Sequence, residues 1–427
     1  MSKLAMSGGT PVRTKPFPVW PMRDERERAA LLEVWEKPTW SSGPGYYRAD
    51  PAASKARQLE AKFAAYHDSK HAIATGSGTD AIQIGFKICG VGLGDEVIVP
   101  AETFIATVTP ILQLGGIPVF VDIDPETRCI DPEAVEAAIT PRTRCIAPVH
   151  LTGRPADMDR IMDIAARHGI EVMADCAHAH GSEWRGKKVA AVSQAGAFSL
   201  QQEKGMTAGG EGGILVTSDD TKADWAHIFQ NDGRGLGDEG WQYQGLGWNF
   251  RMSEFQAAIA LVQLERLDSV IDAKTRAVGK LKTAFADMGG LRFPADDPRI
   301  TRQSYLYPWL HYNREAFGGI PAKTFCEAVR AEGIPFHGGS DPDRALYKHP
   351  IFTEKRYGMA GYQSRIKHPA EAVDYTQVHC PVAEGGQVEG IGFPQTVLLG
   401  EEGDIQDVID AVGKVVENIE ELAKVTA

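Results

Sequence analysis

One lysine, Lys204, stands in a glycine-rich stretch between two apolar runs, and the stretch reads Ser199-Leu200-Gln201-Gln202-Glu203-Lys204-Gly205-Met206-Thr207-Ala208-Gly209-Gly210. Glycines let a backbone approach a ligand closely, and loops beside strand ends carry function disproportionately often. A lysine amine is the group that forms a Schiff base with an aldehyde. Most lysines are solvated surface residues, so this loop indicates such chemistry only together with other groups.

A carboxylate, Asp175, begins a second segment, which reads Asp175-Cys176-Ala177-His178-Ala179-His180-Gly181 and follows the apolar run 171–174. Such a carboxylate needs a partner, because burying an unpaired charge is costly. A protonated pyridine nitrogen would serve, and so would a helix N-terminus or a buried ion pair. A metal site is disfavoured, because His178 and His180 beside one Asp lack a clear further ligand.

Two further segments suit a flat, phosphorylated ligand. Residues 75–81 form a small-residue turn that leads into a helical pattern and contains Gly78 and Thr79. Backbone N–H groups at a helix N-terminus favour a phosphate, although a plain helix cap would have the same sequence. Residues 100–104 end in Phe104, which suits stacking on a ring and equally suits a core position.

These four segments follow four of the apolar runs in a pattern that alternates strands with helices. The expected strands are 71–74, 96–99, 118–121, 145–150, 171–174, 197–200 and 213–216. Strands separated by helices predict an α/β fold with a mostly parallel sheet covered by helices. Ligands bind beyond the carboxyl ends of such strands. A phosphate cradle, a stacking aromatic, a carboxylate and an amine are together the contacts that pyridoxal 5'-phosphate (PLP) needs.

The length of 427 residues exceeds the size at which single cores stop growing, roughly 250–300 residues. We expect an N-terminal arm at 1–50, a large α/β domain at 51–265, and a linker helix with a small α+β domain at 266–427. Ser253 is the expected N-cap of the long helix. Other expected elements are helices at 157–168, 323–332 and 404–425 and a strand at 305–310.

Composition restricts the classes of partner. The formal net charge is −12 and no dense run of Lys or Arg is present, which argues against a nucleic-acid partner. No segment approaches ~18 apolar residues, so neither a membrane span nor a signal core is expected, and a cytoplasmic location follows. The six cysteines form no Cys-x-x-Cys pair and are expected to be buried thiols.

The four segments, together with 247–254, resemble the DegT/StrS family of PLP-dependent aminotransferases, which act on keto sugars and cyclitols. The resemblance runs from about residue 18 to the C-terminus. It implies the fold-type-I architecture, with Lys204 as the Schiff-base lysine. Asp175 would hold the pyridine nitrogen, His178 would lie beside the ring, and Phe104 would stack on it.

The same resemblance assigns the phosphate to two groups of residues. Gly78, Thr79 and Ser199 would hold it from their own chain, and Asn249 would reach it from the neighbouring subunit. That implies a homodimer with shared active sites. One departure is visible: the family usually has one residue fewer between the lysine and Glu-Gly-Gly, so Gly209-Gly210 resembles a one-glycine insertion.

The expected activity is transfer of an amino group from L-glutamine or L-glutamate to a keto-cyclitol or keto-sugar. Residues 198–207 resemble the cyclitol branch, and the amide of Gln201 can both donate to and accept from the hydroxyls of a polyol. Two alternatives of the same fold stay open: a nucleotide-linked keto-sugar aminotransferase and an aminohydroxybenzoate-type synthase or dehydratase. A non-catalytic regulator is disfavoured by the intact Lys204 and Asp175.

Overall fold

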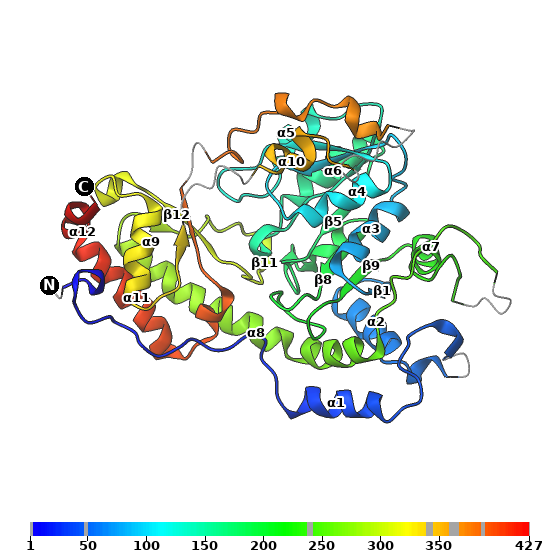
Figure 1. Ribbon diagram of the computed structural model, residues 1–427, viewed down its shortest axis with the longest axis horizontal. Coiled ribbons are helices and arrows are strands. Elements are labelled where there is room, and N and C mark those ends of the chain that lie inside the picture. Colours follow the sequence, from blue (N-terminus) through cyan, green and yellow to red (C-terminus); the bar gives the residue numbers. More distant parts are fainter. Residues whose placement is uncertain are drawn as a thin grey trace.

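A seven-stranded sheet forms the centre of the larger part of the computed structural model (Figure 1), which describes residues 3–46, 50–236, 242–338, 345–357, 367–385 and 389–426. The strand order is β1-β9-β8-β5-β4-β2-β3. The strands are β1 (His71–Thr75), β2 (Glu96–Pro100), β3 (Ile117–Val121), β4 (Thr143–Ile146), β5 (Glu171–Asp175), β8 (Ala195–Ser199) and β9 (Gly213–Thr217). Only β9 pairs antiparallel with its neighbours, so the carboxyl ends of the other strands meet at one edge.

Helices cover both faces of this sheet. Side chains alternate across β1, so that Ala72 and Ala74 enter one apolar cluster and Ile73 enters the other. The first cluster includes α2 (Lys55–Tyr66), α5 (Pro132–Ala137), α6 (Met158–His168) and the start of α8 (Glu254–Asp287). The second includes α3 (Gly78–Ile88), α4 (Thr109–Gln113) and α7 (Asp220–Gln230). This double cover is what a largely parallel sheet requires.

The long helix α8 links the two halves of the molecule (Figure 1). Ser253 caps it, with a reciprocal bond from Gln256, as the sequence predicted. Its second half packs in a third apolar cluster with α9 (Ala322–Ala331) and α11 (Glu402–Glu417). That cluster also covers the four-stranded sheet of β10 (Leu291–Arg292), β12 (Trp309–Tyr312), β14 (Gly390–Gly392) and β13 (His337–Gly338). A separate apolar cluster with its own small sheet is therefore built around the end of α8.

Part of the C-terminal region packs on the large sheet rather than on the small one. Apolar side chains of the described residues between 345 and 383 belong to the second cluster, with α10 (Pro350–Thr353) among them. Tyr375 donates to the carbonyl of Pro118, in β3, at 2.9 Å. The boundary predicted at residue 265 falls inside α8, and the division of the chain into domains at that point stays a prediction.

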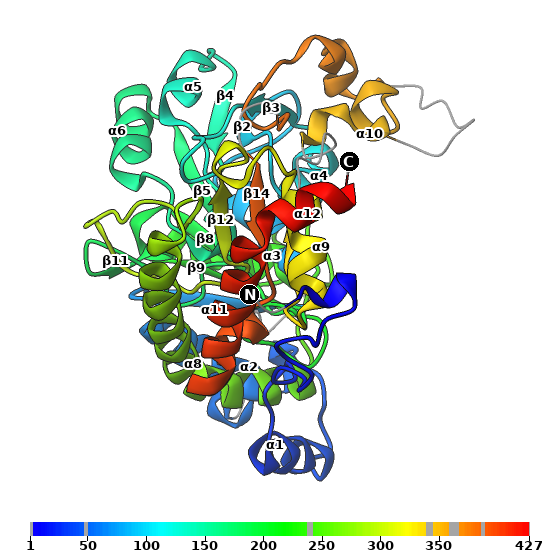
Figure 2. The same ribbon diagram turned by 90° about the vertical axis from the view of Figure 1, so that its left-hand side faces the viewer.

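The N-terminal segment runs along both halves. Arg13 is buried against the start of α11, where it donates to Asp404 at 2.8 Å. Figure 2 shows this segment beside α11 and α1 (Glu25–Trp35) below α8. Between them Trp20 donates its indole N–H to the carbonyl of Gln202 at 2.7 Å. The segment thus reaches the loop that carries Lys204.

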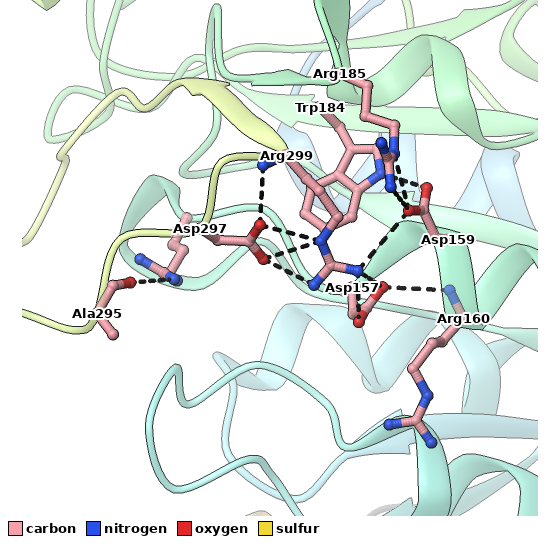
Figure 3. A network of polar contacts seen from close by, with 9 residues as sticks. Asp157, Asp159, Arg160, Trp184, Arg185, Ala295, Asp297 and Arg299 are labelled. Carbon is pink, nitrogen blue, oxygen red and sulfur yellow. Dashed lines mark hydrogen bonds and ion pairs between the residues drawn. The ribbon is translucent and has the colours of Figure 1, made fainter.

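A charged network holds the chain after β10 against the large sheet's helices (Figure 3). Arg299 donates to Asp297 at 2.8 and 3.0 Å and to Asp157, the N-cap of α6, at 2.9 and 3.0 Å. Its guanidinium also lies over the ring of Trp184, 4.6 Å from the centroid. Trp184 in turn donates to Asp159 at 2.8 Å. This network attaches β11 (Ile300–Arg302) to β6 (Glu183–Trp184), and β7 (Lys187–Lys188) completes that small sheet.

Three expected elements differ from those observed. The strand expected at 145–150 ends at Ile146. The strand expected at 305–310 begins only at Trp309, because Tyr305 has a φ of +48° and Pro308 has no N–H for a ladder. The helix expected at 404–425 is two helices, α11 and α12 (Ile419–Thr426), separated at Asn418. None of the helices in the described part of the chain is long and apolar enough to cross a membrane.

Phe63 on α2 offers a test of this packing. It is fully buried and meets the ring of Phe198, on β8, edge to face at 5.1 Å between centroids. We expect Phe63→Ala to lower the free energy of unfolding by about 3–5 kcal/mol, because the cavity cannot fully collapse. Urea denaturation followed by circular dichroism measures the change. The neighbouring exposed change Lys62→Ala should cost less than about 1 kcal/mol; equal losses in the two variants would contradict the packing described.

Candidate active site

The segments singled out in the sequence meet at the carboxyl edge of the large sheet. β1, β2, β5 and β8 run in the same direction, and each ends directly before one of these segments. The loops after β5 and β8 adjoin because these two strands are neighbours, with Asp175 opposite Ala197. The sheet topology therefore gathers the carboxylate, the amine, the aromatic and the helix N-terminus at one place.

Asp175 is a buried carboxylate held by two donors. Its Oδ2 accepts from the hydroxyl of Thr107 at 2.8 Å, and its Oδ1 accepts from the backbone N–H of Ala177 at 3.0 Å. Burial raises the pKa of Asp175 above its ordinary value, although both donors and the positive charge of Lys204 act in the opposite direction. Among the described residues no cationic side chain forms an ion pair with it. The carboxylate therefore lacks the cationic partner that would favour its charged form.

Lys204 and His178 face each other across the site. The Nζ of Lys204 lies 3.0 Å from Nε2 of His178. The backbone N–H of Thr152 donates to Nδ1 of the same imidazole at 3.3 Å, so the proton of the neutral ring is on Nε2. Burial, assisted by the charge of Lys204, lowers the pKa of His178, and burial also lowers the pKa of Lys204. Both groups therefore lose a proton more readily than they would in water, and a neutral His178 can donate its Nε2 proton to Lys204 whenever the amine is unprotonated.

An unprotonated amine is the form of lysine that attacks a carbonyl carbon. Burial thus makes this form of Lys204 easier to reach than it is for a solvated lysine. Asp175 and Glu203 both oppose the lowering of the pKa of Lys204, but burial is the larger cause. The site is suited to reversible Schiff-base chemistry at Lys204.

Known proteins match this chain over nearly its whole length. The model of the DegT/DnrJ/EryC1/StrS aminotransferase family matches residues 23–412. The chain belongs to this family. An L-glutamine:2-deoxy-scyllo-inosose aminotransferase of Streptoalloteichus tenebrarius is 36% identical over 430 residues, covering 98% of this chain and 99% of that protein.

Two further matches agree with this assignment. An L-glutamine:scyllo-inosose aminotransferase of Streptomyces griseus is 35% identical over 432 residues, covering 99% of this chain and all of that protein. The crystal structure of 3-amino-5-hydroxybenzoic acid (AHBA) synthase superposes with a TM-score of 0.81 at 30% identity, covering 95% of this chain and all of that one. The expected fold-type-I α/β architecture is confirmed, and the protein is an aminotransferase of the DegT/StrS family.

Family and fold imply PLP as the cofactor, and the residues at the sheet edge fit it. A protonated pyridine nitrogen is the partner that the buried Asp175 lacks. Phe104, at the end of the segment after β2, is 70% exposed, which is unusual for an aromatic next to a buried strand and leaves its ring free for a ligand. Gly78 lies so close to Ser199 that a Cβ there would come 2.6 Å from the Cβ of Ser199. The small residue therefore permits the close approach of the two segments that the phosphate contacts require.

The phosphate turn itself has the geometry of a helix start. Gly78 and Thr79 are the first two residues of α3, and Ser77 caps it by accepting from the N–H of Asp80 at 3.1 Å. The two alternatives weighed for this turn, a cap and an anion site, are therefore compatible. The cap is made by Ser77, and a helix start of this kind still offers other N–H groups to an anion.

The Lys204 loop is held by its own backbone and by Gln201. Lys204 N–H donates to the carbonyl of Gln201 at 3.0 Å, and Glu203 N–H donates to Oε1 of Gln201 at 2.7 Å. The side-chain oxygen expected to bind substrate hydroxyls is thus occupied within the loop. Gly209 and Gly210 have φ values of +84° and +128°, which only glycine adopts easily, and Gly210 pairs with Gln201. The pairing of Gly210 with Gln201 therefore joins the two ends of the Lys204 loop.

Asn249 lies in an exposed segment beside the phosphate turn. The carbonyl of Phe250 accepts from Gly76 N–H at 2.8 Å, and Arg251 pairs with Thr75. Asn249 itself pairs through its backbone with Asn231. Its contact with a neighbouring subunit's phosphate stays a prediction, because the structure contains one chain.

Sequence reasoning missed three contributors: Thr107, Thr152 and Trp20. Thr107 ends a short 3-10 turn, Ile105–Thr107, three residues after Phe104, and nothing in the segment indicated that its hydroxyl reaches Asp175. Thr152 reaches His178 through its backbone, with a φ of +57°. Such backbone contacts depend on conformation rather than on residue type, so no motif reports them. No group of three or more His, Cys, Asp or Glu side chains suited to a metal occurs within the described ranges.

The lowered pKa of Lys204 predicts its reactivity as a function of pH. In protein freed of bound small molecules, acylation of Lys204 should reach half of its own maximal rate at a lower pH than acylation of a free lysine side-chain analogue added as a standard. The reason is that a lower pKa leaves a larger unprotonated fraction at each pH below it. Competitive labelling followed by mass spectrometry, from about pH 6 to about pH 11, measures both amines in one sample. Superimposable curves would show that burial does not shift Lys204.

Proposed function

We propose that the protein transfers an amino group from L-glutamine, or from L-glutamate, to the ketone of a polyhydroxylated ring, with PLP as cofactor. The observation that carries this proposal is the similarity, at 35–36% identity along almost the entire chain, to aminotransferases named for L-glutamine and scyllo-inosose substrates. The arrangement of Lys204, His178 and Asp175 supports it, because each of the groups needed for the chemistry is present.

The proposed roles follow from where each side chain lies. Bound PLP supplies the chemistry of accepting an amino group from the donor and passing it to the ketone. Lys204 would hold the cofactor through its amine and, once released, move protons between carbon and nitrogen atoms of the substrate. Asp175 would keep the pyridine nitrogen protonated, and His178 would orient the Lys204 amine through its Nε2 proton.

The remaining residues would bind rather than react. Phe104 would lie against the ring, and Gly78, Thr79 and Ser199 would hold the phosphate at the start of α3. The ketone would enter from the side of Tyr307, whose ring meets that of His178 at 5.5 Å between centroids. A tyrosine hydroxyl both donates and accepts hydrogen bonds and so suits a polyol.

A second candidate function is an aromatising synthase. It is favoured by the superposition on AHBA synthase, which matches over the full length of that chain. The two functions differ in the product: the synthase would release water from the acceptor, whereas the aminotransferase would return an amine with every hydroxyl retained.

A homodimer is the proposed assembly, and the exposed surface near Asn249 supports it. Trp225, Tyr243, Leu246 and Trp248 are each more than half exposed. Trp225 and Leu246 line a mainly apolar groove of about 600 Å³ between α7 and the segment before Asn249. Exposed apolar clusters of this kind indicate a protein partner, and C₂ dimers are the commonest assembly. A second copy covering this face would meet Asn249 beside the phosphate turn.

The substrate proposal predicts a two-step spectral cycle. PLP-loaded protein should lose its visible absorbance with L-glutamine, or failing that with L-glutamate, and regain it with scyllo-inosose. Lys204→Ala should abolish the cycle, because no other group at the site can replace the amine. A nucleotide-linked 4-keto sugar serves as the competing acceptor. Recovery with that sugar alone would refute the cyclitol acceptor, and mass spectrometry showing loss of water from the product would favour the synthase.

The shared-site dimer predicts complementation between two variants, assayed at a PLP concentration too low for Asn249→Ala alone to be active. We expect Asn249→Ala to weaken PLP retention in equilibrium dialysis, whereas Asn313→Ala, in a loop of the small domain, should not. Lys204→Ala and Asn249→Ala protein, unfolded and refolded together, should recover about a quarter of wild-type activity, because half of the dimers are mixed and each has one intact site. An active monomer in light scattering, or mixtures as inactive as their components, would rule out the shared site.

A further inference from the structure

A second buried lysine, Lys274, lies on α8 behind the active-site loops. Its side chain is 1% exposed, and within the described ranges it forms no ion pair with a carboxylate. It donates instead to two neutral oxygens, Oε1 of Gln395 and the carbonyl of Ser304, the latter at 3.4 Å. A lysine buried without a counter-charge is costly, which is why such residues are rare in positions without a function.

The first of these contacts leads to Lys204. Gln395 begins the 3-10 turn Gln395–Leu399 of the small domain and is itself buried. Its amide Nε2 donates to the carbonyls of Glu203 and Lys204, at 3.1 and 3.4 Å. Lys274 holds the other end of the same amide, so the orientation of Gln395 is set with its oxygen toward Lys274 and its nitrogen toward the Lys204 loop.

The second contact leads to His178. Ser304 is buried, and its hydroxyl donates to the carbonyl of His178 at 2.7 Å. Its backbone N–H donates to the hydroxyl of Ser182 at 3.1 Å. Lys274 is therefore connected through Gln395 to the backbone at Lys204 and through Ser304 to the backbone at His178. The side chains of Lys204 and His178 are the two that meet at 3.0 Å in the site.

We propose that Lys274 is a positioning residue for the amino-transfer reaction, which through Gln395 and Ser304 fixes the placement of Lys204 against His178 and ties the small domain to the Lys204 loop. The inference rests on the proposed function only in taking Lys204 as the cofactor lysine. It concerns no contact of Lys274 with substrate or cofactor.

The charges around Lys274 agree with this role. Burial lowers the pKa of Lys274 to about 7. Titratable groups near it include His178, whose carbonyl binds Ser304, together with His180 and Lys204. Burial, followed by the positive charges of Lys204 and Lys274, lowers the pKa of His180 to about 3, so this imidazole stays neutral beside them. A charge on Lys274 orders the two oxygens that it contacts, the carbonyl of Ser304 and Oε1 of Gln395.

The test uses PLP-loaded full-length protein and three variants, Lys274→Met, Gln395→Leu and the double variant. The control is Lys280→Met, on the same helix but exposed, where Lys280 pairs with the exposed Glu402. The readouts are kcat and KM for the L-glutamine half-reaction and the pH midpoint of the bound cofactor's visible absorbance. The midpoint reports the environment of the Lys204 nitrogen, which a merely structural role would leave unchanged.

We expect Lys274→Met to lower kcat about tenfold or more with little change in KM, since small misplacements of catalytic groups cost rate rather than binding. The absorbance midpoint should rise by about one pH unit, because losing a buried cation and admitting water both favour the protonated form. Gln395→Leu should shift it in the same direction, and the double variant should be no worse than the more affected single variant. The control should behave as wild type.

A fourth variant, Gln395→Glu, separates the contact of Gln395 with Lys274 from its contacts with the Lys204 loop. It keeps an oxygen for Lys274 but removes the donor to the carbonyls of Glu203 and Lys204, so it should resemble Gln395→Leu. If Lys274→Met does not fold, Gln395→Glu still tests the positioning role. A wild-type midpoint and kcat in Gln395→Glu, or additive effects in the double variant, would overturn the proposal.

Borohydride reduction of the wild type distinguishes this proposal from the one on which it rests. If the adduct is on Lys204 and the variants keep the wild-type kcat and absorbance midpoint, only the positioning role of Lys274 is refuted. An adduct on another lysine, Lys274 included, removes the proposed role of Lys204 and the positioning role with it.

Discussion

Burial of the Asp175 carboxylate at the carboxyl end of β5 costs free energy that the surrounding residues only partly recover. Thr107 and the N–H of Ala177 supply hydrogen bonds, but no cation among the described residues completes the charge balance. Much of the site can be understood from this imbalance. The carboxylate is placed where a cationic ligand would be bound most strongly, in a region of low dielectric constant. Because the strand that carries it is fully covered, the position of that charge is fixed.

The same exclusion of water acts on Lys204 in the opposite sense. A buried amine loses its proton more readily, and so does a buried imidazole, so burial lowers the pKa of both members of the pair that meets at 3.0 Å. The backbone N–H of Thr152 then determines which imidazole nitrogen carries the proton. One physical cause, desolvation, thus raises the pKa of Asp175 and lowers the pKa of Lys204. The fold supplies that desolvation through the apolar clusters on the two faces of the sheet.

Buried polar contacts near these groups join the two halves of the molecule. α8 belongs to both, and Lys274 and Gln395 connect the small sheet's surroundings to the Lys204 loop. On the outer side, Arg299 and its aspartates attach the chain after β10 to α6 (Figure 3). Polar contacts at such a junction are directional, so they fix the relative orientation of the two halves more strictly than apolar packing alone would.

The amino-acid sequence by itself determined which residues could do chemistry and which segments become strands. The apolar runs and the glycine-rich turns are local signals, and they predicted the sheet, the Ser253 cap and the set formed by Lys204, Asp175 and Phe104. Only the tertiary structure decided the partners of these residues. Thr107 lies 68 positions from Asp175, and Gln395 lies 191 positions from Lys204. The tautomer of His178 depends on a backbone conformation at Thr152. Such contacts arise from chain crossings that no local pattern encodes, because many residue types could supply a hydroxyl, an amide or an N–H at those points.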